Sequence, residues 1–279
     1  MLIANNVIKN RLVTLIKEID SNNPNYDLLQ KWLDNNSNYE ITLDIYNNLD
    51  YNNLPKEIVE LKEYLIAKEV WAIGGDGWAY DIGFSGIDHV LASNDNINIL
   101  VLDSQVYSNT GGQSSKSSHK GSVASFATSG KKASKKDLAR IALAYPNAYV
   151  AQVSLGANPM QVIKAFNEAS NHNGPSIIIA YTPCISHGIK GGMENSFEQE
   201  KLATSCGYFP TFRYNPNEDK FTLDSKKVDF DKYEEFLNSE SRYSNLKKIN
   251  KEEADRLLEE NKNEAIRRFN YYKSLEKED

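Results

Sequence analysis

The sequence is poor in cysteine, in long apolar runs and in positive charge. Its 279 residues include two cysteines, Cys184 and Cys206, which are too few for a disulfide framework. No segment approaches the roughly 18 unbroken apolar residues of a membrane-spanning helix, and the charged N-terminus lacks the small-residue cleavage site of a secretory signal peptide. The net charge of −6 leaves no basic stripe for a nucleic-acid backbone. We therefore expect a cytoplasmic protein that binds neither membrane nor nucleic acid.

Three regions follow one another along the chain. Residues 1–69 carry apolar side chains at helical spacing, which predicts a helical N-terminal segment. Residues 70–215 contain short β-branched apolar runs, typical of parallel strands that are buried on both faces. The strands are expected at 70–73, 97–102, 149–155 and 176–181, and helices at about 79–92, 135–145 and 159–171. Residues 216–279 read as a C-terminal extension of loops that ends in a charged helix from about Lys251. The sequence thus predicts an α/β fold with a doubly wound, mostly parallel sheet.

The chemically informative residues follow the first two expected strands. Ligands of a doubly wound sheet bind beyond the carboxyl ends of its strands. There the segment GGDGW places Gly75 and Gly77 before a helix, where a bare backbone and free N–H groups favour a phosphate. Asp76 would repel that phosphate unless a hard divalent cation lies between them. Asp103 ends the next strand and leads into the polar turn SQVYSNTGG, so we expect a magnesium-bound diphosphate at this edge.

Two simpler interpretations compete with this site. A Gly-Asp-Gly triplet taken alone is most often an ordinary turn. A plain nucleotide site is the other possibility, but the sequence contains neither G-x-G-x-x-G in the right register nor G-x-x-x-x-G-K-[ST].

The longer pattern GGDGWAYDIGFSGIDHVLAS, followed by VLDSQVYSNTGGQSSKSS, resembles the thiamine-diphosphate domain of the pyruvate:ferredoxin (flavodoxin) oxidoreductases. The resemblance extends through GPSIIIAYTPCISHG and GYFPTFRYNP, over about residues 70–225. Enzymes of that family are several times longer, so the chain resembles a C-terminal fragment or a separately encoded subunit. The resemblance implies oxidative decarboxylation of pyruvate with coenzyme A to acetyl-coenzyme A, carbon dioxide and reduced ferredoxin or flavodoxin.

The resemblance also implies roles for individual residues. Asp76, the Ser104 hydroxyl and the Val106 carbonyl match the magnesium ligands of the family, in which threonine usually stands at the serine position. Asn109 matches the residue that reaches the reacting carbon, where an amide N–H can stabilise developing oxyanion charge. From spacing alone, Asn109 could equally cap the turn that follows it. The positions that match the lining of the cofactor are Gly75, Asp76, Gly77, Trp78, Ser104, Gln105, Val106, Tyr107, Ser108 and Asn109.

Cys184 follows the expected strand 176–181 and matches the isolated fourth thiolate of a four-iron four-sulfur cluster in that family. A lone cysteine is more often a small apolar side chain. Cys206 matches no ligand position, so the resemblance implies that the other three thiolates lie outside this chain. His119 and His187 lie near these loops, but neither has a metal-ligand partner at useful spacing.

The resemblance places two further catalytic groups in other domains: the glutamate that activates thiamine and the arginine that pairs with the pyruvate carboxylate. We therefore expect the chain to be inactive alone and to act with the remaining domains or subunits in a dimer or larger complex. Two alternatives stay open. The chain could be the β-type subunit of another 2-oxo acid oxidoreductase, for example one for 2-oxoglutarate, or a non-catalytic assembly module with the same fold.

Overall fold

The computed structural model of the chain describes residues 2–276. The chain divides into two compact units, Met1–Val70 and Trp71–Asp279. The division falls next to the predicted start of the α/β region, where the polar segment before Trp71 carries no helix or strand.

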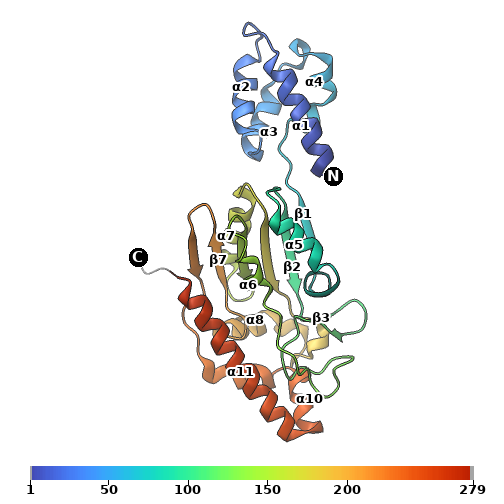
Figure 1. The fold of residues 1–279 in the computed structure, drawn as a ribbon, viewed down its shortest axis with the longest axis vertical. Helices are drawn as coiled ribbons and strands as arrows, with labels where there is room; N and C mark the ends of the chain where they lie inside the picture. The colour runs from blue at the N-terminus through green and yellow to red at the C-terminus, as the bar shows by residue number, and fades with distance from the viewer. Residues whose placement is uncertain (1, 277–279) are drawn as a thin grey trace. The chain divides into compact units, whose positions relative to one another are not determined.

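The first unit is a small helical bundle (blue in Figure 1). It consists of α1 (Leu2–Lys17), α2 (Tyr26–Asn35), α3 (Tyr39–Asn48) and α4 (Lys56–Glu60), with short 3-10 turns after α3 and α4. The bundle forms because each long helix turns apolar side chains inward, such as Leu12 of α1, Trp32 of α2 and Ile45 of α3, all of which are fully buried. The Trp32 Nε1 group also donates a hydrogen bond of 2.6 Å to the Leu65 carbonyl, which ties the end of the bundle to its core.

The second unit is built on a six-stranded sheet in the order β1-β2-β6-β5-β7-β8. The first four strands in this order are parallel, and β7 and β8 add an antiparallel edge. Their bounds are β1 (Trp71–Gly75), β2 (Asn98–Asp103), β5 (Tyr149–Val153), β6 (Ser176–Tyr181), β7 (Phe212–Asn215) and β8 (Lys220–Leu223). This architecture confirms the predicted α/β fold with a mostly parallel sheet.

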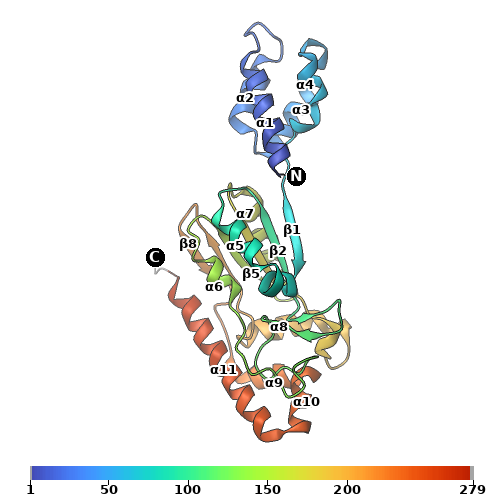
Figure 2. The same cartoon turned by 45° about the vertical axis from the view of Figure 1, so that its right-hand side comes forward.

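Helices cover both faces of this sheet because its central strands are apolar on both sides. On one face, alternate residues of β2 such as Ile99 and Val101 share a core with α5 (Phe84–Ala92), α6 (Leu138–Ala142) and α11 (Lys251–Ser274). On the other face, Ile178 of β6 packs with Ala165 of α7 (Pro159–Asn171). Figure 2 shows α11 running along the second unit.

Local sequence signals set the ends of these helices. α7 begins at Pro159, and the Asn158 side chain before it accepts a hydrogen bond from the Gln161 N–H, as expected for an N-cap. The helix predicted at about 135–145 is shorter and runs from Leu138 to Ala142. The Asp137 side chain caps its start by accepting a hydrogen bond from the Arg140 N–H. The unit also contains the α-helices α8 (Ser196–Ser205), α9 (Tyr233–Asn238) and α10 (Ser241–Ile249), and a two-stranded sheet of β3 (Val106–Tyr107) and β4 (Gln113–Ser114). Within residues 2–276, no helix combines the length and the apolar composition needed to cross a bilayer.

Candidate functional site

The carboxyl ends of three adjacent parallel strands meet at one cavity of about 640 Å³. β1 leads into Asp76, β2 leads into Ser104, and β6 leads into the segment Thr182–Cys184, and all of these residues line the cavity. Except for Gln105, every residue predicted from the sequence to line a cofactor also lines this cavity. Its size is in the range of ordinary cofactor pockets.

Glycine is required in the first turn because two aromatic walls of the cavity approach the backbone closely. A Cβ atom on Gly77 would lie 2.4 Å from the Tyr107 ring, and one on Gly74 would lie 2.4 Å from the indole of Trp78. The segment Gly77–Ile82 then forms a single π-helical stretch before α5. Such stretches are rare and are frequent at functional sites.

Asp76, Ser104 and Val106 place three oxygen atoms next to one another. The Ser104 Oγ lies 2.8 Å from the Asp76 Oδ1 and 3.1 Å from the Val106 carbonyl oxygen. Neighbouring ligands of an octahedral magnesium ion with bonds of about 2.1 Å are separated by about 3.0 Å. The spacing of the oxygens therefore fits the three protein ligands of a magnesium ion.

The electrostatics of Asp76 fit the same ion. Its side chain is buried, with 1% of the residue exposed. Burial and the nearby Asp103 carboxylate raise the pKa of Asp76, and hydrogen bonds from Ser115 and Ser104 offset only part of that effect. No lysine, arginine or histidine among the described residues forms an ion pair with Asp76. Lys135 lowers the pKa of Asp76 only through space, because its ion pair is with Asp103, and a bound divalent cation would stabilise this buried carboxylate further.

Gln105 was predicted to line the cofactor, but its side chain points away from the cavity. Its backbone has a φ of 61°, in the left-handed region, and the residue is fully buried. The Gln105 Oε1 accepts a hydrogen bond of 2.6 Å from the Tyr208 hydroxyl. The Gln105 carbonyl accepts another from Ser118. The left-handed backbone thus turns this side chain into the core, where it holds the second turn in place.

Asn109 lies exposed in the lining of the cavity. The turn that follows it is fixed by other groups: Thr110 and Gln113 bond each other, and the Gly112 N–H donates to the Tyr107 carbonyl. No hydrogen bond of the Asn109 side chain is found within residues 2–276, so the described structure gives no support to a capping role for it. Its amide is therefore available to a ligand.

The two cysteines occupy different environments. Cys184 lines the cavity, and its Sγ accepts a hydrogen bond of 3.4 Å from the Ser186 N–H. Partial burial would raise the pKa of the Cys184 thiol, but hydrogen bonds from Ser108 and Ser186 outweigh burial and lower it. Cys206 lies fully buried in the core of the second unit, and burial raises the pKa of its thiol to about 12. Cys184 is therefore the thiol that can serve as a ligand.

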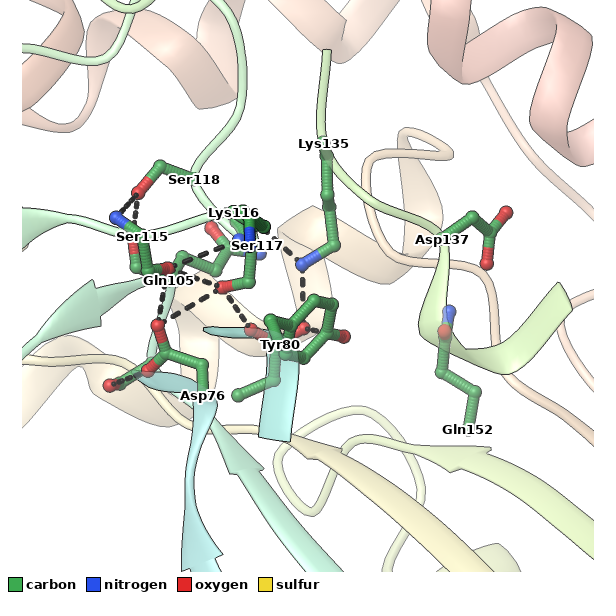
Figure 3. A network of polar contacts seen from close by, with 12 residues as sticks. Asp76, Tyr80, Gln105, Ser115, Lys116, Ser117, Ser118, Lys135, Asp137 and Gln152 are labelled. Carbon is green, nitrogen blue, oxygen red and sulfur yellow. Dashed lines mark hydrogen bonds and ion pairs between the residues drawn. The ribbon is translucent and has the colours of Figure 1, made fainter. Parts of the chain in front are cut away.

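Several residues around Asp76 were not recognised from the sequence. Ser115 and Ser117 both reach the Asp76 carboxylate (Figure 3). Lys135 pairs with the neighbouring Asp103. The His187 ring, which is fully buried, lies 2.6 Å from the Ser104 carbonyl oxygen through its Nε2 atom. The two serines lie in a long loop, and their spacing from Asp76 in the sequence does not predict the contact.

Comparison with known proteins relates the residues of this site to a protein family. The model of the family described as thiamine pyrophosphate enzyme, C-terminal TPP binding domain, matches residues 59–180. The α/β part of the chain thus contains a match to the C-terminal domain of thiamine pyrophosphate enzymes. The matched residues of this thiamine pyrophosphate domain contain Asp76, Ser104, Val106 and Asn109, whereas Cys184 lies just beyond them.

Several curated relatives are much longer than the chain. It is 48% identical over 231 residues to the pyruvate:ferredoxin oxidoreductase of Moorella thermoacetica, and the alignment covers 81% of this chain and 20% of that protein. It is 46% identical over 227 residues to the mitochondrial pyruvate dehydrogenase [NADP(+)] of Euglena gracilis, and the alignment covers 80% of this chain and 12% of that protein. It is 39% identical over 297 aligned positions to the pyruvate-flavodoxin oxidoreductase of Enterobacter agglomerans, and the alignment covers 99% of this chain and 25% of that protein. The thiamine pyrophosphate domain and its flanking segments thus span a quarter or less of these relatives.

Proposed function

We propose that this chain binds magnesium thiamine diphosphate and forms the diphosphate half of the active site of a pyruvate:ferredoxin (flavodoxin) oxidoreductase. The observation that carries the proposal is the cluster of Asp76 Oδ1, Ser104 Oγ and Val106 O beside the cavity, with spacings that suit an octahedral ion. The relatives named as pyruvate oxidoreductases support the choice of substrate.

In this proposal, the residues of the chain hold the cofactor and prepare its surroundings. Asp76, Ser104 and Val106 would hold the magnesium ion, which neutralises diphosphate oxygens that Asp76 alone would repel. When bound, thiamine diphosphate supplies the nucleophilic carbon and the electron sink for decarboxylation. The free amide of Asn109 at the cavity would donate a hydrogen bond to the oxygen of the 2-oxo acid as negative charge develops there.

The proposed role of Cys184 is to supply one thiolate of a four-iron four-sulfur cluster. The sequence contains two cysteines, and Cys206 is buried in the core, so this chain alone cannot hold such a cluster. The other thiolates, the glutamate that activates thiamine and the arginine for pyruvate would come from the remaining domains or subunits. Coenzyme A and ferredoxin or flavodoxin complete the proposed set of partners.

The proposal is tested by reconstitution. Candidate N-terminal polypeptides from the same genome are co-purified with the chain, and reduction of a viologen dye is measured with pyruvate, 2-oxoglutarate or no substrate. We expect no rate from the chain alone and a pyruvate-dependent rate in the complex. The same complex with Asn109→Ala should lose most of its rate, and an exposed control, Ser125→Ala, should keep it. A rate with 2-oxoglutarate but not with pyruvate would favour a 2-oxoglutarate oxidoreductase. No rate with any partner would favour a non-catalytic assembly module.

A further inference from the structure

A second layer of side chains surrounds the Asp76 carboxylate. Its Oδ1 faces Ser104. Its Oδ2 accepts a hydrogen bond from the Ser115 Oγ at 2.5 Å and lies 3.2 Å from the Ser117 Oγ (Figure 3). Both serines are buried, with at most 4% exposed. The Ser117 N–H donates to the Ser115 Oγ at 3.1 Å, which leaves the Ser115 hydroxyl hydrogen free to point at Asp76. The two oxygens of Asp76 therefore have different surroundings.

Ser117 connects Asp76 to the second buried carboxylate, Asp103. The Ser117 Oγ lies 2.8 Å from the Asp103 Oδ1, closer than it lies to Asp76. The Asp103 Oδ2 accepts hydrogen bonds from the Tyr80 hydroxyl at 2.9 Å and from the Lys135 Nζ at 2.7 Å. Both oxygens of Asp103 are thus occupied by donors from the chain itself.

Lys135 separates the roles of the two carboxylates. Its side chain is 9% exposed and that of Asp103 is fully buried, so their ion pair is shielded from water. The Lys135 Nζ also donates to the Ser117 carbonyl at 2.9 Å, which fixes the backbone of the serine that bridges the carboxylates. The charge of Asp103 is neutralised within the chain, and Asp76 is left as the carboxylate that requires an external cation.

We propose that Ser115 and Ser117 are positioning residues that make Asp76 a one-oxygen ligand, and that the site thereby prefers Mg²⁺ to Ca²⁺. This inference rests on the proposed binding of magnesium thiamine diphosphate. With Oδ2 hydrogen-bonded by Ser115 and flanked by the Ser117 hydroxyl, Oδ1 alone meets the ion together with Ser104 and Val106. Mg²⁺ accepts this arrangement because it takes six ligands at short, near-octahedral distances. Ca²⁺ is larger and often binds both oxygens of a carboxylate, which the serine pair prevents.

The test is a calorimetric titration of Mg²⁺ and, separately, Ca²⁺ into the full chain with thiamine diphosphate. For wild type we expect Mg²⁺ to bind more tightly. For Ser115→Ala we expect Mg²⁺ affinity to fall by about tenfold or more, as for loss of an outer-shell partner of a metal ligand. Ca²⁺ affinity should fall less or rise, so that the ratio of the two affinities drops. Ser117→Ala should act in the same direction but less strongly, because the Ser117 hydroxyl lies closer to Asp103 than to Asp76.

Two controls separate positioning from folding. Ser115→Thr keeps the hydroxyl and should keep the wild-type ratio, and Ser125→Ala removes a serine of the same loop that bonds the Gly111 carbonyl instead of Asp76. Ser115→Ala and Ser117→Ala variants that keep the wild-type ratio, or lose both ions equally, overturn the inference while the proposed function stands. A wild-type chain that shows no metal-dependent response overturns both.

Discussion

The ion pair of Lys135 and Asp103 provides a quantitative test of the buried network beside the site. Replacing Lys135 by Met keeps the length and apolar character of the stem over the Tyr80 ring, whose centroid lies 4.8 Å from the Nζ, and removes the charge. Removing one member of a buried ion pair costs about 3–5 kcal/mol. Asp103 would retain hydrogen bonds from Tyr80 and Ser117, so we expect the lower end, about 3 kcal/mol.

A double-mutant cycle isolates the pair. Lys135→Met, Asp103→Asn and the double variant are unfolded in urea, and tryptophan emission is followed because Trp71 and Trp78 lie in the second unit. Trp32 lies in the first unit, so its transition should be the same in all four proteins and serves as an internal control. We expect the double variant to lose about 2 kcal/mol less than the sum of the single variants. Additive losses, or a cost below about 1 kcal/mol for Lys135→Met, would refute a charged, buried ion pair between Lys135 and Asp103.

Two further predictions concern the walls of the cavity. Gly77→Ala should destabilise the chain by about 1–3 kcal/mol in thermal unfolding, because the new Cβ would collide with the Tyr107 ring. The matched control is Gly86→Ala in α5, where a new Cβ would lie more than 4 Å from every packed neighbour outside the local helix backbone. It should instead stabilise the chain by about 0.5–1 kcal/mol, and equal effects would contradict the packing. In the native chain, iodoacetamide should modify Cys184, with a pH midpoint below that of a free thiol, and should spare Cys206 until the chain is denatured. Mass spectrometry of the alkylated peptides checks this, and native modification of Cys206 at a similar rate would be inconsistent with its burial.

The central strands could be predicted from the sequence because burial on both faces leaves a continuous apolar run. β2, β5 and β6 lie within one or two residues of the predicted strands. β1 continues two residues beyond its prediction, since Gly74 and Gly75 suggest a turn but pair with Val101 and Leu102 of β2. The hairpin of β7 and β8 was not predicted, because each strand has four residues, some of which are partly exposed. Neither strand contains a continuous apolar run.

The meeting of Asp76 with Ser104 also followed from the sequence, because neighbouring parallel strands end at the same edge of a sheet. The arrival of Ser115 and Ser117 did not. Their loop is placed by distant contacts: Lys131 donates to the carbonyls of Ser115 and Ser118, and Lys120 pairs with Glu260 and Glu264 of α11. Such tertiary contacts leave no periodic signal in the sequence, and the same holds for the side chain of Gln105, which Tyr208 draws into the core.

The most direct measurement is a calorimetric titration of thiamine diphosphate into the wild-type chain and into Asp76→Ala, each with Mg²⁺ and with a chelator. The wild-type chain should bind the cofactor in a magnesium-dependent manner, and Asp76→Ala should show no difference between the two conditions, because the buried carboxylate that calls for the cation is gone. Binding by Asp76→Ala that equals the wild type in affinity and in magnesium dependence would contradict the assignment of this edge of the sheet as the cofactor site.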